Sequence, residues 1–367
     1  MRIMYLTESM RWSGGAQQLF GMALALQKRG HEMVLACQPG SDILARAQTA
    51  GLETEVVRMR QDYDFPAAVR IARALRRRRV ELLHAQHSTA HALGLLAAAF
   101  TRVPVFAVTR RVIFPLRTHI FSRLKYLSRR IDGYVAISEA VRQELLKGGV
   151  RAARIEVIPS VMDAPKASPE EGRRLRQELG LDPARPVITT VANYSDFKGH
   201  DYLVQAAADV VQAFPLAQFL LVGRDTERLG ERVERLGLKG AVHLAGFRTD
   251  VPRVLAASDF FVFPSLQEAA GTALREAMAA GLPCIGARVG GIPESIADGD
   301  TGLLVPPADS PALARAILQM LRAPAQARAM AERGRAWVES HFSLSAVSPR
   351  MEAFYTRLLS GAQDGRG

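Results

Sequence analysis

Two glutamates eight positions apart are the most informative polar residues of the chain. Glu268 follows a short apolar run, and Glu276 lies in a stretch of helical composition. We expect Glu268 in a loop and Glu276 about one turn inside the next helix. The start of that helix, at Gly271, Thr272 and Ala273, offers backbone amides to a phosphate, and both carboxylates can accept hydrogen bonds from sugar hydroxyls. Alone, such a pair is more often a helix-dipole glutamate and a surface glutamate.

Two glycine-containing turns are further candidate phosphate sites. Gly14 and Gly15 stand between the first apolar run and a helical pattern, where backbone amides can approach a phosphate. Lys198 and Gly199 occupy the same position after the first expected strand of the second half, where a lysine can neutralise a diphosphate. By itself each turn is weak evidence, because a ligand-free turn or a solvent-exposed lysine explains it equally well.

The histidines and cysteines favour no metal site. His84, His87 and His91 lie along one strand-to-helix stretch without carboxylate companions, and such spacing more often marks a helix face beside a polar cleft. Cys37 and Cys284 lie in apolar runs in opposite halves of the chain, so we expect reduced core thiols rather than a disulfide or a zinc framework. We therefore expect neither a metal nor a cofactor.

Alternating strand and helix patterns must position these motifs. The expected strands are 3–7, 33–37, 55–57, 82–85, 105–108, 134–137 and 155–158 in the first half and 187–192, 219–222, 242–244, 260–263, 283–285 and 302–305 in the second. Helical patterns between them are typical of βαβ units with parallel sheets. The Pro-containing stretch 163–169 predicts a linker, and 345–359 a final helix. Ligands of such sheets bind at the carboxyl ends of strands, where the motifs lie.

Composition and charge set limits on the class of protein. The length of 367 residues favours two domains. The hydrophobic fraction of 48% is typical of a globular protein. The longest apolar run, 92–100, is shorter than the roughly 20 residues needed to span a bilayer. The amino terminus resembles a first strand rather than a signal peptide, so we expect a cytoplasmic protein.

A net charge of +12 favours an anionic partner, and its distribution is informative. The segment 102–130 carries eight Lys or Arg and no acidic residue, and Leu116, Ile120, Leu124 and Leu127 recur within it at helical spacing. This pattern predicts a basic amphipathic segment. Either it packs its apolar stripe on the domain, or it contacts an anionic membrane surface.

Taken together and in this order, the motifs resemble the retaining glycosyltransferases of family 4, also called glycosyl transferases group 1. The resemblance rests on the E-x7-E pair within 265–306 and on the segments 14–17, 136–139, 158–163, 198–199 and 258–265. It implies an α/β protein of the GT-B fold, with two Rossmann-like domains whose parallel sheets face each other across a cleft. An acceptor-binding domain would cover 1–163, a donor-binding domain 164–345, and a closing helix with a frayed tail 346–367.

The resemblance also implies roles for individual residues. Glu276 would hold the donor ribose, Glu268 the hydroxyls of the transferred sugar, and Lys198 the diphosphate leaving group. The loop of Phe247 and Arg248 would meet the nucleotide base. The donor-binding set is Gly14, Gly15, Asn193, Lys198, Arg224, Phe247, Arg248, Glu268, Gly271, Thr272, Ala273 and Glu276. The predicted catalytic residues are Lys198, Glu268 and Arg110.

Some positions depart from the family's pattern. Asn193 stands where many members carry an arginine, so Arg224 or the nearby lysine is expected to carry more of the diphosphate charge. Arg110 follows the fifth strand, where members often have a histidine close to the transferred sugar. Either Arg110 or one of His84 and His87 is therefore expected to contact that sugar.

The implied reaction is metal-independent hexosyl transfer, with retained configuration, from a nucleotide-sugar donor to a hydroxyl acceptor. The basic segment favours a lipid-linked or envelope glycan acceptor, as in lipopolysaccharide or exopolysaccharide assembly, at the inner face of the plasma membrane. One alternative is a nucleotide-sugar epimerase of the same fold, although the first half offers no convincing acid–base carboxylate pair. Another is a non-enzymatic basic binding protein, but no nucleic-acid motif with interleaved aromatics is present. The sequence leaves open the donor base, the sugar, the acceptor and the oligomeric state.

Overall fold

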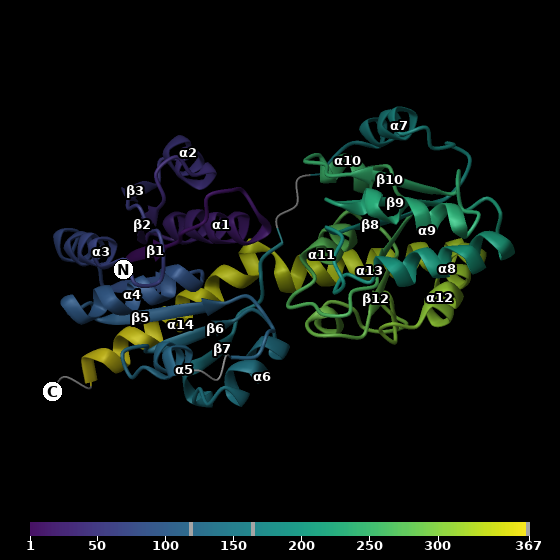
Figure 1. Ribbon diagram of the computed structural model, residues 1–367. Coiled ribbons are helices and arrows are strands. Elements are labelled where there is room, and N and C mark those ends of the chain that lie inside the picture. The colour runs from purple at the N-terminus through teal and green to yellow at the C-terminus, as the bar shows by residue number, and fades with distance from the viewer. Residues whose placement is uncertain (117–119, 163–165, 365–367) are drawn as a thin grey trace. The chain divides into compact units, whose positions relative to one another are not determined.

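The protein consists of two α/β domains (Figure 1). The computed structural model describes residues 1–116, 120–162 and 166–364. The first domain comprises Met1–Val161 together with Phe342–Gly367, and the second comprises Met162–His341. No helix within the described ranges is both long and apolar enough to cross a membrane.

The first domain is built on a parallel sheet with the strand order β3-β2-β1-β4-β5-β6-β7. Its strands are β1 (Arg2–Leu6), β2 (Glu32–Cys37), β3 (Glu53–Val56), β4 (Leu82–Ala85), β5 (Val105–Arg110), β6 (Gly133–Ala136) and β7 (Ile155–Val157). From β1 the chain builds outward to β3, then returns to β4 and builds toward the opposite edge. The carboxyl ends of β1 and β4 therefore form a topological switch point, where ligands of such sheets bind.

Helices cover this sheet. They are α1 (Gly14–Lys28), α2 (Asp42–Thr49), α3 (Phe65–Arg77), α4 (Ser88–Phe100), α5 (Ile120–Leu127), α6 (Glu139–Lys147), the short η1 (Ala152–Arg154) and α14 (Leu344–Asp364). The last of these, shown in yellow in Figure 1, rejoins the first domain and packs on α1 and β5. Its side chains Val347, Phe354 and Tyr355 are buried in the same core as Ile3 and Leu19.

The second domain repeats the plan with the strand order β10-β9-β8-β11-β12-β13. Its strands are β8 (Val187–Val191), β9 (Gln218–Val222), β10 (Val242–Gly246), β11 (Phe260–Phe263), β12 (Cys284–Ala287) and β13 (Leu303–Val305). Its helices are α7 (Pro169–Glu178), α8 (His200–Ala213), η2 (Thr226–Leu229), α9 (Gly230–Arg235), α10 (Val251–Ala256), α11 (Thr272–Ala279), η3 (Ile292–Glu294), α12 (Ser310–Arg322) and α13 (Pro324–Phe342). Here the switch point lies between β8 and β11.

The predicted strands are confirmed, each with its ends shifted by no more than two residues. Cys37 and Cys284 are buried free thiols, as predicted. The final helix, predicted over 345–359, is longer and runs from Leu344 to Asp364, so part of the tail expected to be frayed is helical. The predicted linker 163–169 lies partly outside the described residues, which omit 163–165.

The basic segment 102–130 contains the predicted strand, Val105–Arg110, and a helix, Ile120–Leu127, while residues 117–119 lie outside the described part of the chain. Leu116 packs toward Gly148, where an added Cβ would lie 2.0 Å from its Cδ1 atom. Leu124 is 63% exposed. The regular leucine spacing therefore does not mark one continuous stripe packed on the domain.

Candidate functional site

Lys198 and Glu268 meet at the switch point of the second sheet. Lys198 lies in the loop after β8, and Glu268 lies in the loop after β11. Their Nζ and Oε2 atoms are 2.6 Å apart, and the side chains are 29% and 14% exposed. The lysine Nζ atom also lies 5.5 Å from the centre of the Phe263 ring. Two residues predicted from separate motifs thus form one partly buried ion pair.

The start of α11 belongs to the same constellation. The second carboxylate oxygen of Glu268 accepts hydrogen bonds from the backbone N–H of Gly271, at 3.2 Å, and of Ala270, at 3.4 Å. Gly271 is the residue before α11 and has a φ of +68°. Because the start of a helix carries partial positive charge, it lies beside the ion pair as a second cationic element. Thr272 and Ala273 open the helix, as predicted.

Close backbone contacts at glycines hold the two loops together. Gly199 has a φ of +69°, and an added Cβ would lie 2.0 Å from the carbonyl oxygen of Pro264. Gly290 has a φ of +52°, and its added Cβ would lie 1.7 Å from the carbonyl oxygen of Glu268. The neighbouring Gly291 N–H donates to that same oxygen at 3.0 Å. The side of Gly199 that lacks a side chain therefore faces the backbone of Pro264, whereas a phosphate was expected to approach this glycine.

Glu276 lies on α11 one turn beyond its start, as predicted. Its burial raises the pKa of the carboxyl to about 7. The preceding residue, Arg275, is fully buried and donates from Nε to Ser295 at 2.8 Å. Burial lowers the pKa of Arg275 to about 10. The sequence did not point to Arg275, because an arginine in a helix is normally exposed to solvent.

The remaining predicted donor residues lie at the ends of β8, β9 and β10. Asn193 Oδ1 accepts a hydrogen bond from the Arg224 backbone N–H at 3.0 Å. The Arg224 guanidinium lies 4.4 Å from the ring centre of Phe247, which is 55% exposed. The Arg248 guanidinium, in contrast to that of Arg224, donates hydrogen bonds to both carboxylate oxygens of Asp250, at 2.8 and 2.7 Å. Arg224 and Phe247 therefore present an exposed stacked surface, whereas the charge of Arg248 is already paired.

In the first domain, Gly14 and Gly15 begin α1, and the Ser13 side chain caps that helix. An added Cβ at Gly15 would lie 3.3 Å from Nε2 of His87, whereas Gly14 faces open space. His87 Nδ1 lies 2.9 Å from the Thr7 hydroxyl, a contact that joins the ends of β1 and β4. Burial lowers the pKa of His87 to about 4, so its ring is neutral at pH 7.

His84 lies away from any surface. It is completely buried, with Nδ1 2.5 Å from the Tyr355 hydroxyl and Nε2 2.7 Å from the Thr109 hydroxyl. The Tyr355 hydroxyl in turn lies 2.9 Å from that of Tyr5. Burial lowers the pKa of His84 to about 3. We conclude that this histidine joins α14 to the sheet, and that a sugar contact would require it to leave the core.

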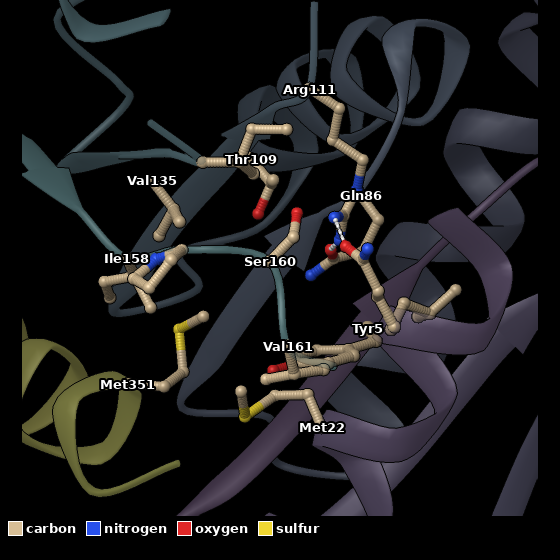
Figure 2. A pocket seen from close by; sticks show the side chains of 14 residues that line it. Tyr5, Met22, Gln86, Thr109, Arg111, Val135, Ile158, Ser160, Val161 and Met351 are labelled. Carbon is tan, nitrogen blue, oxygen red and sulfur yellow. Dashed lines mark hydrogen bonds between the residues drawn. The ribbon is translucent and has the colours of Figure 1, made fainter. Parts of the chain in front are cut away.

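Arg111, rather than Arg110, lies beside the Gly15 turn. An added Cβ at Gly15 would be 3.7 Å from Cδ of Arg111. The Arg111 guanidinium donates to Gln18 at 2.8 Å and to Gln86 at 2.9 Å (Figure 2). It borders a cavity of about 20 Å³, room for roughly one water molecule. Burial lowers the pKa of Arg111 to about 10.

Arg110 points to a different place. It donates to the Tyr126 hydroxyl at 2.9 Å and to the Phe114 carbonyl oxygen. Adjacent residues of a strand face opposite sides, and β5 runs to Arg110, two residues beyond its expected end. This alternation was the sequence signal that could have shown that Arg110 and Arg111 point in different directions. The catalytic role assigned to Arg110 stays a prediction.

Within the described ranges, no group of three or more His, Cys, Asp or Glu is arranged to hold a metal ion. The metal independence of the reaction stays a prediction. What the site offers chemically is a lysine ammonium, a helix start and two carboxylates, one of them ion-paired and one mostly buried. Such a set can hold an anionic group next to hydroxyl groups.

Two doubly wound parallel domains with this site define a glycosyltransferase of the GT-B fold. The sequence matches the family Glycosyltransferase Family 4 over residues 12–164 and Glycosyl transferases group 1 over residues 185–323. The chain belongs to this glycosyltransferase family.

Similar proteins agree with this assignment. The N-acetyl-alpha-D-glucosaminyl L-malate synthase of Bacillus anthracis is 27% identical over 83% of this chain and 82% of its own length. The D-inositol 3-phosphate glycosyltransferase of Segniliparus rotundus is 34% identical over 57% of this chain and 48% of its own length. Anabaena HepE, solved in complex with UDP-glucose, has a TM-score of 0.83 at 23% identity, covering 97% of this chain and 100% of that chain. This last likeness concerns the fold alone.

Proposed function

We propose that this glycosyltransferase uses a nucleotide-diphosphate sugar as donor and transfers a hexosyl group to a hydroxyl acceptor with retained configuration. The second domain would bind the donor, and the first would bind the acceptor. The proposal is supported most directly by the meeting of Lys198, Glu268 and the start of α11 at one switch point. Solved structures of similar fold carry UDP or UDP-glucose, which is consistent with a nucleotide-sugar donor.

The diphosphate of the donor would lie between Lys198 and the start of α11. A lysine ammonium has three N–H donors, and the structure directs one of them to Glu268. The pair holds the ammonium in place while its other donors can reach phosphate oxygens. Preorganised donors aimed at developing negative charge are usually the largest contribution to catalysis. We therefore assign stabilisation of the departing nucleotide diphosphate to these two elements, without a metal ion.

The sugar and nucleoside parts would be held by carboxylates and by the stacked surface. Glu268 would accept hydrogen bonds from sugar hydroxyls, and Glu276 from the ribose. Arg224 and Phe247, which are stacked at 4.4 Å, would border the base. In this scheme the acceptor hydroxyl attacks the face from which the diphosphate leaves, and a leaving phosphate oxygen takes the hydroxyl proton. No protein nucleophile is required, so the rate would come from orientation and charge stabilisation.

We further propose a lipid-linked or envelope glycan as the acceptor, and peripheral contact of the first domain with an anionic membrane surface. Support comes from the net charge of +12 and from the basic segment 102–130. Within that segment Val112, Phe114 and Leu124 are exposed apolar side chains. Basic residues next to exposed apolar side chains are the chemistry that binds anionic lipid surfaces. Flotation with liposomes that contain anionic lipid tests this, and a protein that stays at the bottom of the gradient would remove the membrane proposal.

A thermal-shift panel of UDP-, GDP-, ADP- and CMP-sugars tests the donor assignment. One of these donors is expected to stabilise the protein, since a ligand that binds only the folded state raises the unfolding temperature. Product analysis with the identified donor follows, with and without a hydroxyl acceptor and in the presence of EDTA. Transfer that needs the acceptor, retains the anomeric configuration and survives EDTA supports the proposal. Conversion of the donor without acceptor would instead indicate an epimerase, and absence of any donor binding would overturn the proposal.

A further inference from the structure

The first domain contains a second cavity, here called the basic pocket, of about 540 Å³. This volume is in the range of small-molecule sites. It lies where β4 and β5 end, because Ser88 begins α4 after β4 and Arg110 ends β5. Its described lining residues are Asp62, Ser88, Arg110, Val112, Phe114, Pro115, Leu116, Ser122, Lys125 and Tyr126.

Arg110 brings an uncompensated positive charge to the basic pocket. The residue is only 6% exposed. Its hydrogen-bond acceptors are the Tyr126 hydroxyl and the Phe114 carbonyl oxygen, and its guanidinium lies 5.1 Å from the Tyr126 ring centre. Its Nε atom is buried without a hydrogen-bond partner among the described residues. A buried guanidinium with only neutral partners is costly, and an anionic ligand would offset that cost.

The other charges of the basic pocket cancel each other. Lys125 Nζ lies 3.0 Å from Asp62 and also donates to the carbonyl oxygen and hydroxyl of Ser88, at 2.6 and 3.0 Å. Asp62 also accepts a hydrogen bond from the Thr89 hydroxyl at 2.9 Å. Among the described lining residues, two cations therefore face one carboxylate. The excess charge is the one on Arg110.

One wall of the basic pocket is apolar. Val112, Phe114, Pro115 and Leu116 line it, and the first two are 44% and 51% exposed. Exposed apolar side chains next to a buried cation suit a ligand with an anionic group and a hydrocarbon part.

We propose that the basic pocket binds the phosphoryl group of an acceptor that carries an apolar chain. Arg110 is the counter-ion of the phosphoryl group, and Val112 and Phe114 contact the chain. Describing this ligand as the acceptor rests on the proposed transferase function; the binding site itself does not. The proposal gives Arg110 a positioning role toward the acceptor in place of a role at the transferred sugar.

Binding of decyl phosphate, measured by calorimetry below its critical micelle concentration, tests the charge assignment with two variants of opposite sign. Arg110→Gln removes the positive charge and is expected to weaken binding at least tenfold. Asp62→Asn removes the carboxylate but keeps an oxygen for the Thr89 hydroxyl, so binding is expected to strengthen severalfold. Damage to the fold cannot strengthen binding, so the second variant separates charge from structure.

A matched control is Glu53→Gln, which removes an exposed carboxylate that pairs with Arg78 at the β3 edge of the same domain. It changes the net charge by the same amount and is expected to leave binding within twofold. Equal effects of Asp62→Asn and Glu53→Gln would overturn the pocket assignment, as would unaltered binding in Arg110→Gln.

Two further probes separate the phosphoryl group from the chain. Glycerol phosphate has no chain, decanol has no charge, and both are expected to bind more weakly than decyl phosphate. Phe114→Ser should weaken decyl phosphate severalfold and leave glycerol phosphate unchanged. Glycerol phosphate binding as tightly as decyl phosphate would overturn the chain assignment, and decanol binding as tightly would overturn the phosphoryl assignment.

Donor binding keeps this inference distinguishable from the proposed function. If no nucleotide sugar stabilises the protein but decyl phosphate binding follows Arg110 and Asp62 as expected, the transferase proposal fails and the site stands. If a nucleotide sugar binds and decyl phosphate does not, the donor assignment stands and the basic pocket is overturned. Neither result depends on a turnover assay.

Discussion

A lysine and a glutamate meet at the switch point of the second domain, whereas a histidine and a threonine meet at that of the first. Lys198 and Glu268 are 2.6 Å apart and partly exposed. His87 and Thr7 are 2.9 Å apart, and burial keeps His87 neutral with a pKa of about 4. The same topology therefore places a lysine–glutamate ion pair at one switch point and a neutral histidine–hydroxyl contact, with the Arg111 guanidinium nearby, at the other.

The two switch points also differ in what supports them. In the second domain, Gly199 and Gly290 let neighbouring backbone segments approach within distances that no side chain permits. In the first domain, support comes from buried side chains, with His84, Tyr355 and Tyr5 bonded in series. We infer that backbone contacts fix the loops of Lys198 and Glu268, and that a side-chain network fixes the α14 side of the first domain.

The largest expected effect comes from closing the space at Gly199. Gly199→Ala places a Cβ 2.0 Å from the Pro264 carbonyl oxygen, in addition to the cost of about 1–2 kcal/mol of a left-handed alanine. The loops of Lys198 and Glu268 must then separate. We expect the free energy of unfolding of the second domain to fall by more than about 4 kcal/mol, the range reserved for severe backbone or packing damage. Urea unfolding of the purified variant measures this.

Gly237→Ala is the matched control, because Gly237 has the same φ of +69° with nothing within 4 Å of an added Cβ. It is expected to lose only the conformational cost of about 1–2 kcal/mol. Equal losses in the two variants would show that backbone conformation alone matters and that the contact with Pro264 does not hold the loops.

The next effect is catalytic. Lys198→Ala removes the cation assigned to the leaving diphosphate while the Glu268 carboxylate keeps its bonds to Gly271 and Ala270. Loss of one preorganised donor of this kind costs about 10²- to 10³-fold in kcat. Steady-state turnover with the donor found in the thermal-shift panel measures it. Lys239→Ala, which removes an 82% exposed lysine paired with Glu234, is expected to turn over like the parent protein.

A smaller effect is expected from Glu276, and it depends on pH. Its pKa is about 7 in the folded protein and 4.5 ordinarily. Between these values the folded state binds more protons than the unfolded chain, so the stability contributed by Glu276 falls as the pH rises. Glu276→Gln carries no such titration. The variant should match the parent near pH 4.5 and exceed its free energy of unfolding by up to about 3 kcal/mol at pH 8.

Urea unfolding at a series of pH values measures the difference between the parent protein and Glu276→Gln. Glu268→Gln is a useful comparison, because Glu268 is ion-paired with Lys198 rather than isolated by burial. A difference between Glu276→Gln and the parent that is constant over pH 4.5–8 would contradict the raised pKa.

Most of the strands could be predicted from the sequence because they are buried on both faces. Runs such as Leu82–Ala85 and Phe260–Phe263 are continuously buried, and apolar runs of that length bounded by polar residues indicate strands of a parallel sheet. The basic segment 102–130 was harder, because the helical spacing of its apolar residues does not show which of them are buried, and Leu124 is 63% exposed.

The candidate site was predictable where it depends on topology. Lys198 and Glu268 both follow strands that flank the switch point, so their proximity follows from the strand order. Arg110 and Arg111 differ in the face of the sheet toward which each side chain points at the end of β5. An error of one residue in the predicted register exchanges the two directions. The burial of His84 depends on Tyr355, which lies 271 positions later in the chain. No local pattern contains that contact.

The smallest effect tests whether the side-chain network of the first domain is purely structural. Tyr355→Phe removes the hydroxyl between His84 Nδ1 and Tyr5, and leaves two buried polar groups without it. An unsatisfied buried group costs about 1–3 kcal/mol, so the free energy of unfolding of the first domain should fall by that amount. Turnover should stay at the parent value, because the network lies in the core. Tyr63→Phe, at a 68% exposed tyrosine, is the control and should change neither quantity. A fall in kcat for Tyr355→Phe without a fall in the free energy of unfolding would instead place His84 in the catalytic machinery. Both domains would then contribute charged or polar side chains to catalysis.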